Sequence, residues 1–199
     1  MAAELDDLIV LDAAAWSSWL AANHSLADGV WLVLAKKGTT EPTALSYDDA
    51  LDAALCHGWI DGQVRRRDER TYRQRFTPRR ARSAWSQRNV AIAERLIAAR
   101  RMHESGLAAV AAAKADGRWE AAYAGPASIE PPADLLAALA AEPRAQSMFE
   151  ILTSQNRYSV LLRIDNAKRS DTRARRIAQF VAMLARGETI HPQKRKLSQ

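Results

Sequence analysis

The chain has 199 residues, 48% of them hydrophobic, and its 29 Lys and Arg against 23 Asp and Glu give a formal charge of +6. The normal apolar fraction and six Trp exclude a disordered chain, and a single Cys excludes both an intrachain disulfide framework and a cysteine-rich zinc site. No apolar run approaches the ~20 residues that a membrane helix needs, and the acidic start lacks the basic segment of a signal peptide. We therefore expect a cytoplasmic protein with no membrane partner.

The charges are segregated along the chain. Residues 1–64 carry 2 basic and 10 acidic groups, whereas residues 65–101 carry 13 Arg and only 3 acidic groups. An Arg side chain holds a carboxylate or a phosphate through two parallel hydrogen bonds, which Lys cannot do. The arginine-rich segment therefore indicates either an anionic partner or pairing with the acidic first third of the chain.

The first 58 residues predict two helices and a strand. Asp12 is a suitable N-cap for a helix that ends near Asn23, and the β-branched and aromatic run 29–35 is typical of a buried strand. Ser46 begins a second helix with a capping box that contains Asp in place of Glu, and Gly58 supplies its left-handed end.

A β-hairpin follows this helix. Residues 59–66 and 71–76 are strand-like, and the polar segment 67–70 joins them. Strand alternation separates the second strand into two faces, one formed by Tyr72, Gln74 and Phe76 and the other by Thr71, Arg73 and Arg75. Pro78 ends this strand because it cannot donate to a ladder.

The remainder of the chain predicts helices. Ser83 or Ser86 caps a helix that runs to about Arg101, and Ser105 caps an Ala-rich helix that stops at Gly117. After a Gly- and Pro-containing linker, further helices are expected with first-turn prolines or polar caps at Pro132, Pro143, Ser154, and Ser170 or Asp171.

These elements predict an α+β fold, with a small antiparallel sheet of about three strands within residues 30–76, flanked by helices, and a helical C-terminal half. We expect an α+β domain over residues 1–124 with the arginine-rich hairpin, a helical subdomain over residues 131–187, and a flexible basic tail over residues 188–199.

Several short sequence motifs occur together between Tyr47 and Trp119: Cys56-His-Gly-Trp-Ile-Asp-Gly62, Gln74-Arg-Phe-Thr-Pro-Arg79, Ser83-Ala-Trp-Ser86 with Asn89, and Ala113-Lys-Ala-Asp-Gly-Arg-Trp119. Others lie further on: Pro131-Pro-Ala-Asp-Leu135, Ala167-Lys168 and Thr172-Arg-Ala-Arg-Arg176. Taken together, they resemble the bacteriocin-protection family, also called YdeI or OmpD-associated proteins, over most of the chain from Leu8 to Gly187. The resemblance implies protection of bacteria against stress or toxic peptides and supplies no reaction.

The residues themselves indicate an anion-binding site between Asp61 and Asn89. A helix N-terminus offers unpaired N–H groups and about half a positive charge, and nearby Arg side chains strengthen such a receptor. We expect Asp61 to orient the arginines, two arginines to hold the anion, three short side chains to donate to it and two tryptophans to form an apolar wall. The candidate ligand-binding residues are Trp59, Asp61, Arg75, Arg79, Ser83, Trp85, Ser86 and Asn89.

A purely structural interpretation of the same residues stays open. In that interpretation Asp61 pairs with Arg75 or Arg79, and the serines only cap the helix. The expected ligand is an anionic small molecule or a peptide.

Nucleic acid is the alternative partner, since the hairpin arginines could follow phosphates while aromatic side chains stack on bases. An unrecognised enzyme is a further alternative, but the four histidines lack metal-ligand spacing and no nucleophile or phosphate-binding motif occurs. We therefore expect binding rather than catalysis, without a metal or a cofactor.

Overall fold

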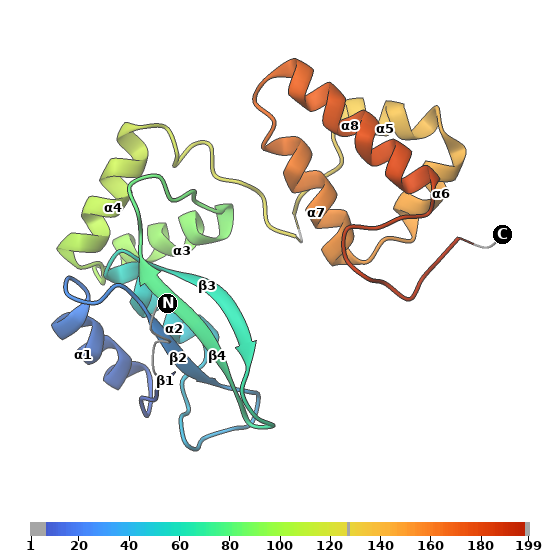
Figure 1. Ribbon diagram of the computed structural model, residues 1–199. Coiled ribbons are helices and arrows are strands. Elements are labelled where there is room, and N and C mark those ends of the chain that lie inside the picture. Colours follow the sequence, from blue (N-terminus) through green and yellow to red (C-terminus); the bar gives the residue numbers. More distant parts are fainter. Residues whose placement is uncertain (1–6, 127, 198–199) are drawn as a thin grey trace. The chain divides into compact units, whose positions relative to one another are not determined.

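The computed structural model describes residues 7–126 and 128–197. The chain divides into two compact units, one ending at Tyr123 and the other beginning at Ala124 (Figure 1). Within the described residues, no helix combines the length and the apolar character that crossing a membrane requires. The α+β class and the helical C-terminal half are as predicted.

Over its described residues, the first unit combines a four-stranded sheet with four helices. Its elements in chain order are β1 (Asp7–Leu8), α1 (Ala13–Asn23), β2 (Val30–Ala35), α2 (Tyr47–Cys56), β3 (Trp59–Arg66), β4 (Thr71–Pro78), α3 (Gln87–Ala98) and α4 (Glu104–Ala115). The strand order is β1-β2-β4-β3, in which β4 is antiparallel to both of its neighbours. The predicted three-stranded antiparallel sheet was incomplete, because β1 adds a two-residue parallel pairing to β2.

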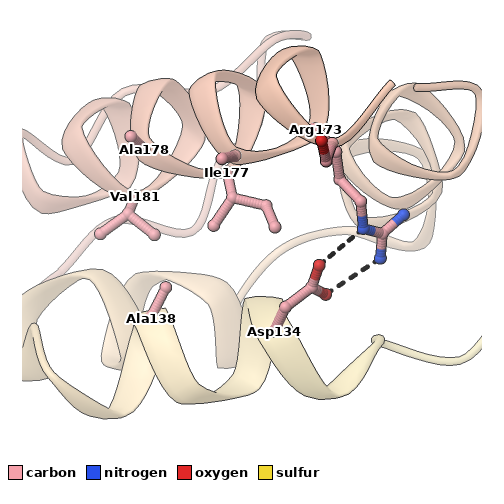
Figure 2. Close-up of a pocket in the computed structure, with 8 residues that line it drawn as sticks. Asp134, Ala138, Arg173, Ile177, Ala178 and Val181 are labelled. Carbon is pink, nitrogen blue, oxygen red and sulfur yellow. Dashed lines mark hydrogen bonds and ion pairs between the residues drawn. The ribbon is translucent and has the colours of Figure 1, made fainter. Parts of the chain in front are cut away.

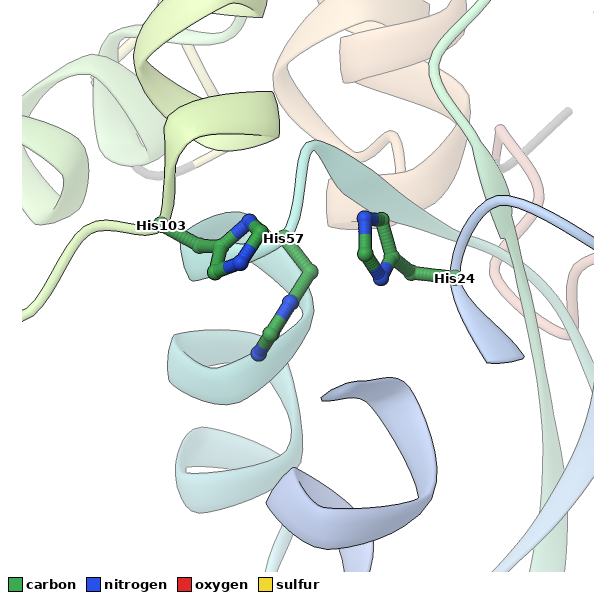
Figure 3. Close-up of side chains that lie close together, drawn as sticks. All are labelled: His24, His57 and His103. Carbon is green, nitrogen blue, oxygen red and sulfur yellow. The ribbon is translucent and has the colours of Figure 1, made fainter. Parts of the chain in front are cut away.

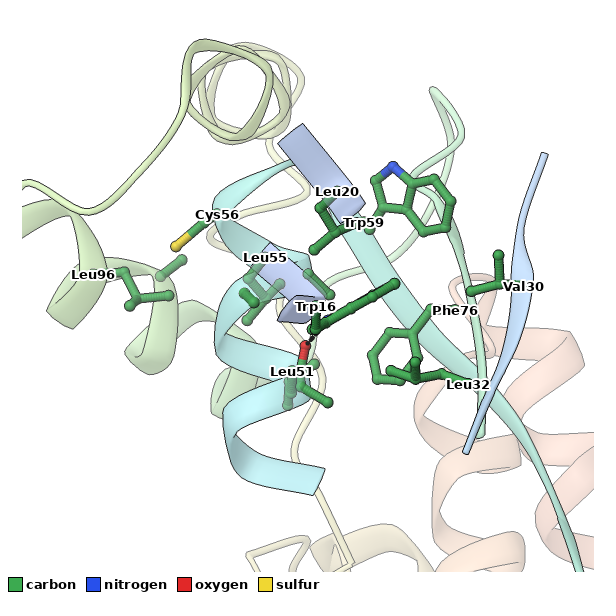
Figure 4. Packing of buried hydrophobic residues seen from close by; sticks show 14 of the residues in the cluster. Trp16, Leu20, Val30, Leu32, Leu51, Leu55, Cys56, Trp59, Phe76 and Leu96 are labelled. Atoms are coloured by element: carbon green, nitrogen blue, oxygen red, sulfur yellow. Dashed lines mark hydrogen bonds between the residues drawn. The ribbon is translucent and has the colours of Figure 1, made fainter. Parts of the chain in front are cut away.

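Aromatic rings fill the core between the sheet and the helices. Trp16 and Trp59 meet edge to face with ring centres 6.4 Å apart, and Phe76 of β4 lies 5.8 Å from Trp16 (Figure 4). The indole N–H of Trp16 donates to the carbonyl of Ala50 in α2, so this fully buried ring also satisfies its polar atom. This core fixes α1 and α2 against the hairpin.

Capping residues predicted from the sequence begin α1, α2 and α3. Asp12 accepts from the amide of Ala15, and Ser46 accepts from the amide of Asp49, both as predicted. Of the two predicted alternatives for α3, Ser86 is the N-cap. The predicted cap Ser105 was wrong, because His103 occupies the N-cap position of α4.

The start of α4 lies directly on the end of α2. The amide of His103 donates to the carbonyl of Cys56 over 3.0 Å. Two glycines permit this approach: a Cβ on Gly106 would lie 2.2 Å from the Cys56 oxygen, and one on Gly58, whose φ is +73°, would lie 2.9 Å from the Ser105 oxygen. The junction therefore has no space for a side chain at either glycine.

The second unit contains four helices, namely α5 (Ala133–Ala140), α6 (Pro143–Glu150), α7 (Ser154–Asp165) and α8 (Ser170–Ala185). Pro143 occupies the first turn of α6 as predicted, whereas Pro132 is the N-cap of α5, Thr153 rather than Ser154 caps α7, and Arg169 precedes α8 without a side-chain cap. Their core is aliphatic apart from Phe149 and includes Leu135, Leu139 and Ile164.

Buried Asn156 of α7 holds the segment that follows α8. Its amide nitrogen donates to the carbonyl of His191 and to Oε1 of Gln193, and its oxygen accepts from the amide of His191. The expected flexible tail thus includes residues with defined hydrogen bonds, while its last two residues, 198–199, lie outside the described part of the chain.

Replacing Gly106 is expected to open the α2–α4 junction. Gly106→Ala should lower the free energy of unfolding of the first unit by about 2 kcal/mol or more, because the new methyl group forces two backbones apart at a cost that exceeds the better helix propensity of Ala. Gly125→Ala is the control, since a Cβ there meets nothing within 4 Å. Trp fluorescence during urea unfolding reports this unit, which contains all six Trp. Equal midpoints for the two variants would contradict the packing described.

Removing the Asn156 side chain should destabilise the second unit alone. Asn156→Ala leaves buried groups without partners, so we expect a loss of about 2–3 kcal/mol. The helical circular dichroism signal should melt earlier while the Trp fluorescence transition stays in place. Asn166→Ala, at an exposed position at the end of the same helix, should change neither signal. A fluorescence shift in Asn156→Ala would argue against independent units.

The hairpin turn should weaken in acid through Asp68. Its carboxylate accepts from the Thr71 hydroxyl and from the amides of Arg70 and Thr71, and these bonds lower its pKa from 3.8 to about 2. The unfolded chain then binds more protons between these values, so stability is lost as the pH falls through this window. Asp68→Asn should show a shallower loss than the wild type in acid urea titrations. Glu69→Gln, in the same turn, should keep the wild-type slope.

Candidate functional site

Internal carboxylates neutralise much of the arginine-rich hairpin. Arg67 pairs with Asp7 and Asp68, Arg73 pairs with the same Asp7, and Arg66 pairs with Glu69. The acidic N-terminal segment therefore supplies part of the countercharge within the first unit. These arginines form internal ion pairs on the sheet, which lowers the charge available to an external anion.

Three hairpin arginines cover the ring of Trp31 in β2. The guanidinium carbons of Arg65, Arg73 and Arg75 lie 4.5, 5.9 and 5.9 Å from the ring centre. Such cation–π contacts favour Arg over a flat aromatic face. The predicted binding residue Arg75 thus lies over Trp31, separate from the contacts of Arg79.

Arg79 lies against Trp85, immediately after β4. Its guanidinium carbon is 3.5 Å from the ring centre of Trp85, and its Nη1 donates to the carbonyl of Ala84 over 3.2 Å. Trp119 lies beside Trp85, with ring centres 4.8 Å apart. Two of the predicted residues, Arg79 and Trp85, are therefore brought together, and both rings are buried.

The remaining donors of this pair lack acceptors. Nε and Nη2 of Arg79 and Nε1 of Trp85 are buried and have no hydrogen-bond partner. Burial lowers the pKa of Arg79 to about 10, while Asp61 acts in the opposite direction, so the group stays charged at neutral pH. An unsatisfied buried donor costs about 1–3 kcal/mol, and more when charged, so this arrangement is costly without an acceptor.

Ser83 and Ser86, predicted to donate to the ligand, instead bond to backbone amides of the chain. Ser86 accepts from the amide of Asn89, and Ser83 accepts from the amide of Arg80. The first amide of α3, that of Gln87, donates to the carbonyl of Tyr123. Two backbone N–H groups at this helix N-terminus, those of Gln87 and Asn89, thus already donate to acceptors in the same chain.

The other two predicted residues have internal partners. Trp59 is 1% exposed, and its indole donates to the carbonyl of His24. Asp61 accepts from the hydroxyl of Tyr47 over 2.8 Å; burial and this carboxylate raise the pKa of that phenol. Among the described side chains, Asp61 forms no ion pair with Arg75 or Arg79.

A filled arginine site in the second unit shows what the donors of Arg79 can hold. Nε and Nη2 of Arg173 donate to the two carboxylate oxygens of Asp134 over 2.6 and 2.9 Å (Figure 2). The ion pair stands at one end of a hollow of about 470 Å³ between α5 and α8, with an apolar lining that includes Ile177 and Val181. The same two nitrogens are the ones without acceptors in Arg79.

Three histidines, which sequence spacing did not relate, lie together in the first unit. His24, His57 and His103 offer one nitrogen each, all within 4.8 Å of one another (Figure 3). Burial is the main cause that lowers the pKa of His57 to about 4, followed by its two histidine neighbours. Each of these residues caps a helix, which is the one local signal that they share.

The two units match different family models. Residues 128–187 match the family described as Bacteriocin-protection, YdeI or OmpD-Associated, which confirms the resemblance over the second unit. Comparisons with curated proteins and with solved structures give no significant match. The other family model covers residues 8–109, just over half of the chain. The chain therefore belongs to the family described as Domain of unknown function (DUF8412), followed by a segment of the YdeI or OmpD-associated type.

Proposed function

We propose that this protein binds an anionic small molecule or a peptide through the oxyanion of that ligand, at Arg79 and Trp85, within a role of the bacteriocin-protection type. The observation that carries the proposal is the pair of buried Arg79 nitrogens, Nε and Nη2, that have no acceptor. The match of residues 128–187 supports the protective role in general terms only.

An oxyanion fits these donors better than a neutral group. Two parallel N–H bonds from one guanidinium match the two oxygens of a carboxylate or a phosphate, and the positive charge strengthens both bonds. The Nε1–H of Trp85, the ring on which Arg79 lies, is a further buried donor without a partner.

Entry of the ligand requires a local displacement, since the unpaired atoms are out of reach of water. The adjoining segment 80–84 is mostly exposed and joins β4 to α3. Movement of this segment would let the unsatisfied donors form hydrogen bonds to water or to a ligand. These bonds offset part of the free energy that the displacement costs. We therefore expect ligands to stabilise the first unit on binding.

Nucleic acid receives less support as the partner. Continuous binding along phosphates needs free cationic side chains, and Arg66, Arg67 and Arg73 are already paired with carboxylates. A phosphate backbone also could not reach the buried nitrogens of Arg79 without the same displacement.

Titration calorimetry with inorganic phosphate, and with N-acetyl amino acids alongside their amides, tests the proposal. The wild type should bind phosphate or the free carboxylates, and the neutral amides should bind at least tenfold more weakly. Arg79→Lys keeps the charge and loses the paired donors, so its affinity should fall roughly tenfold to a hundredfold.

Arg66→Gln is the matched control, because it removes a charge from an exposed hairpin arginine. It should leave anion affinity within twofold of the wild type. Equal affinity in Arg79→Lys and the wild type, or no binding of any anion in the set, would overturn the proposal. Salt-sensitive binding of an oligonucleotide that is weakened by Arg66→Gln and unaffected by Arg79→Lys would favour nucleic acid.

A further inference from the structure

Three helix ends converge at the histidine cluster. His24 follows α1 as its C-cap, His57 follows α2 as its C-cap, and His103 is the N-cap of α4. The ring centres lie 5.2 Å apart for His24 and His57, 5.0 Å for His24 and His103, and 4.9 Å for His57 and His103. The three imidazoles thus form a compact triangle whose members come from distant parts of the sequence.

Hydrogen bonds orient two of the rings. Nδ1 of His24 lies 2.9 Å from the carbonyl oxygen of Leu20. A carbonyl only accepts, so this nitrogen carries the proton in the neutral ring and Nε2 keeps a lone pair. A main-chain carbonyl in this position is the usual outer partner of a metal-binding histidine.

In His103, too, Nδ1 carries the proton of the neutral ring. The hydroxyl of Ser105 donates its single proton to the carbonyl of His57 over 3.1 Å. Its oxygen, 3.1 Å from Nδ1 of His103, is then left to accept, so Nδ1 donates and Nε2 again keeps its lone pair. The capping contact from the Ser105 amide to Nδ1, at 3.4 Å, needs a lone pair on Nδ1, so it forms only in the other neutral tautomer.

His57 supplies an unsatisfied polar atom at the cluster. Its Nδ1 is buried and has no hydrogen-bond partner. A buried imidazole nitrogen normally finds a donor, an acceptor or a metal ion. The C-terminal ends of α1 and α2 bring partial negative charge to this position, and the N-terminal end of α4 offsets part of it.

We propose that His24, His57 and His103 bind one divalent transition-metal ion of the Zn²⁺ type. Imidazole is a preferred ligand for such ions, and three protein ligands leave a fourth position for water or another molecule. His103 is exposed, so this position would face the solvent. Bond lengths of about 2.0–2.1 Å require the three nitrogens to come closer together than their present separations of up to 4.8 Å when the ion binds.

This site is independent of the Arg79 proposal, since the two share no residue. The alternative explanation is a purely structural stack of three neutral rings, in which no ion is needed. The two explanations differ in stoichiometry, in spectroscopy and in the effect of removing one ligand.

Co²⁺ titration of the untagged protein at neutral pH separates the two explanations. We expect one equivalent to give the strong visible absorption of a four-coordinate ion, and Zn²⁺ to displace it. His103→Gln should abolish this absorption and weaken Zn²⁺ binding at least tenfold. Because His103 is exposed, the variant should fold, which circular dichroism verifies. His24→Gln should have the same effect.

His191→Gln is the matched control, because this histidine bonds to Ser159 in the second unit. It should keep the spectrum and the affinity of the wild type. Absence of a one-to-one Co²⁺ spectrum, or an unchanged spectrum in folded His103→Gln, would overturn the metal site.

Discussion

The guanidinium of Arg79 is a charge removed from water without a full set of hydrogen bonds. Stacking on Trp85 and one bond to a carbonyl compensate part of this burial, and two nitrogens remain unpaired. Other hairpin arginines have partners: Arg67 and Arg73 pair with Asp7, and Arg65 lies over the Trp31 ring, although Nε of Arg73 is also buried without an acceptor. Arg79 therefore differs from Arg67 and Arg73 in having two buried nitrogens without acceptors and no carboxylate partner.

Close packing of helix ends brings the three histidines together. The glycines at 58 and 106 let α4 begin on the last turn of α2, which carries His103 to His57. His24 completes the cluster from the end of α1. The α2–α4 junction therefore positions the proposed metal ligands, while the hairpin and the start of α3 position Arg79 and Trp85.

Local signals in the sequence predicted much of the fold and less of the sites. Asp12, Ser46 and Ser86 cap their helices as short-range hydrogen-bonding rules require. His103 replaced the expected cap Ser105 because its amide bonds to a distant carbonyl, and β1 was missed because two residues carry no periodicity. The histidine cluster depends on three tertiary contacts, so no spacing in the sequence could reveal it.

Binding of an anion at Arg79 and Trp85 is tested by NMR, through the side-chain N–H signals of these two residues during titration with the anion that binds. The signals are assigned with Arg79→Lys and Trp85→Phe. We expect the Arg79 Nε–H and Trp85 Nε1–H resonances to shift together and to saturate with the affinity measured by calorimetry. Saturating binding that leaves both resonances unmoved would contradict binding at these two residues.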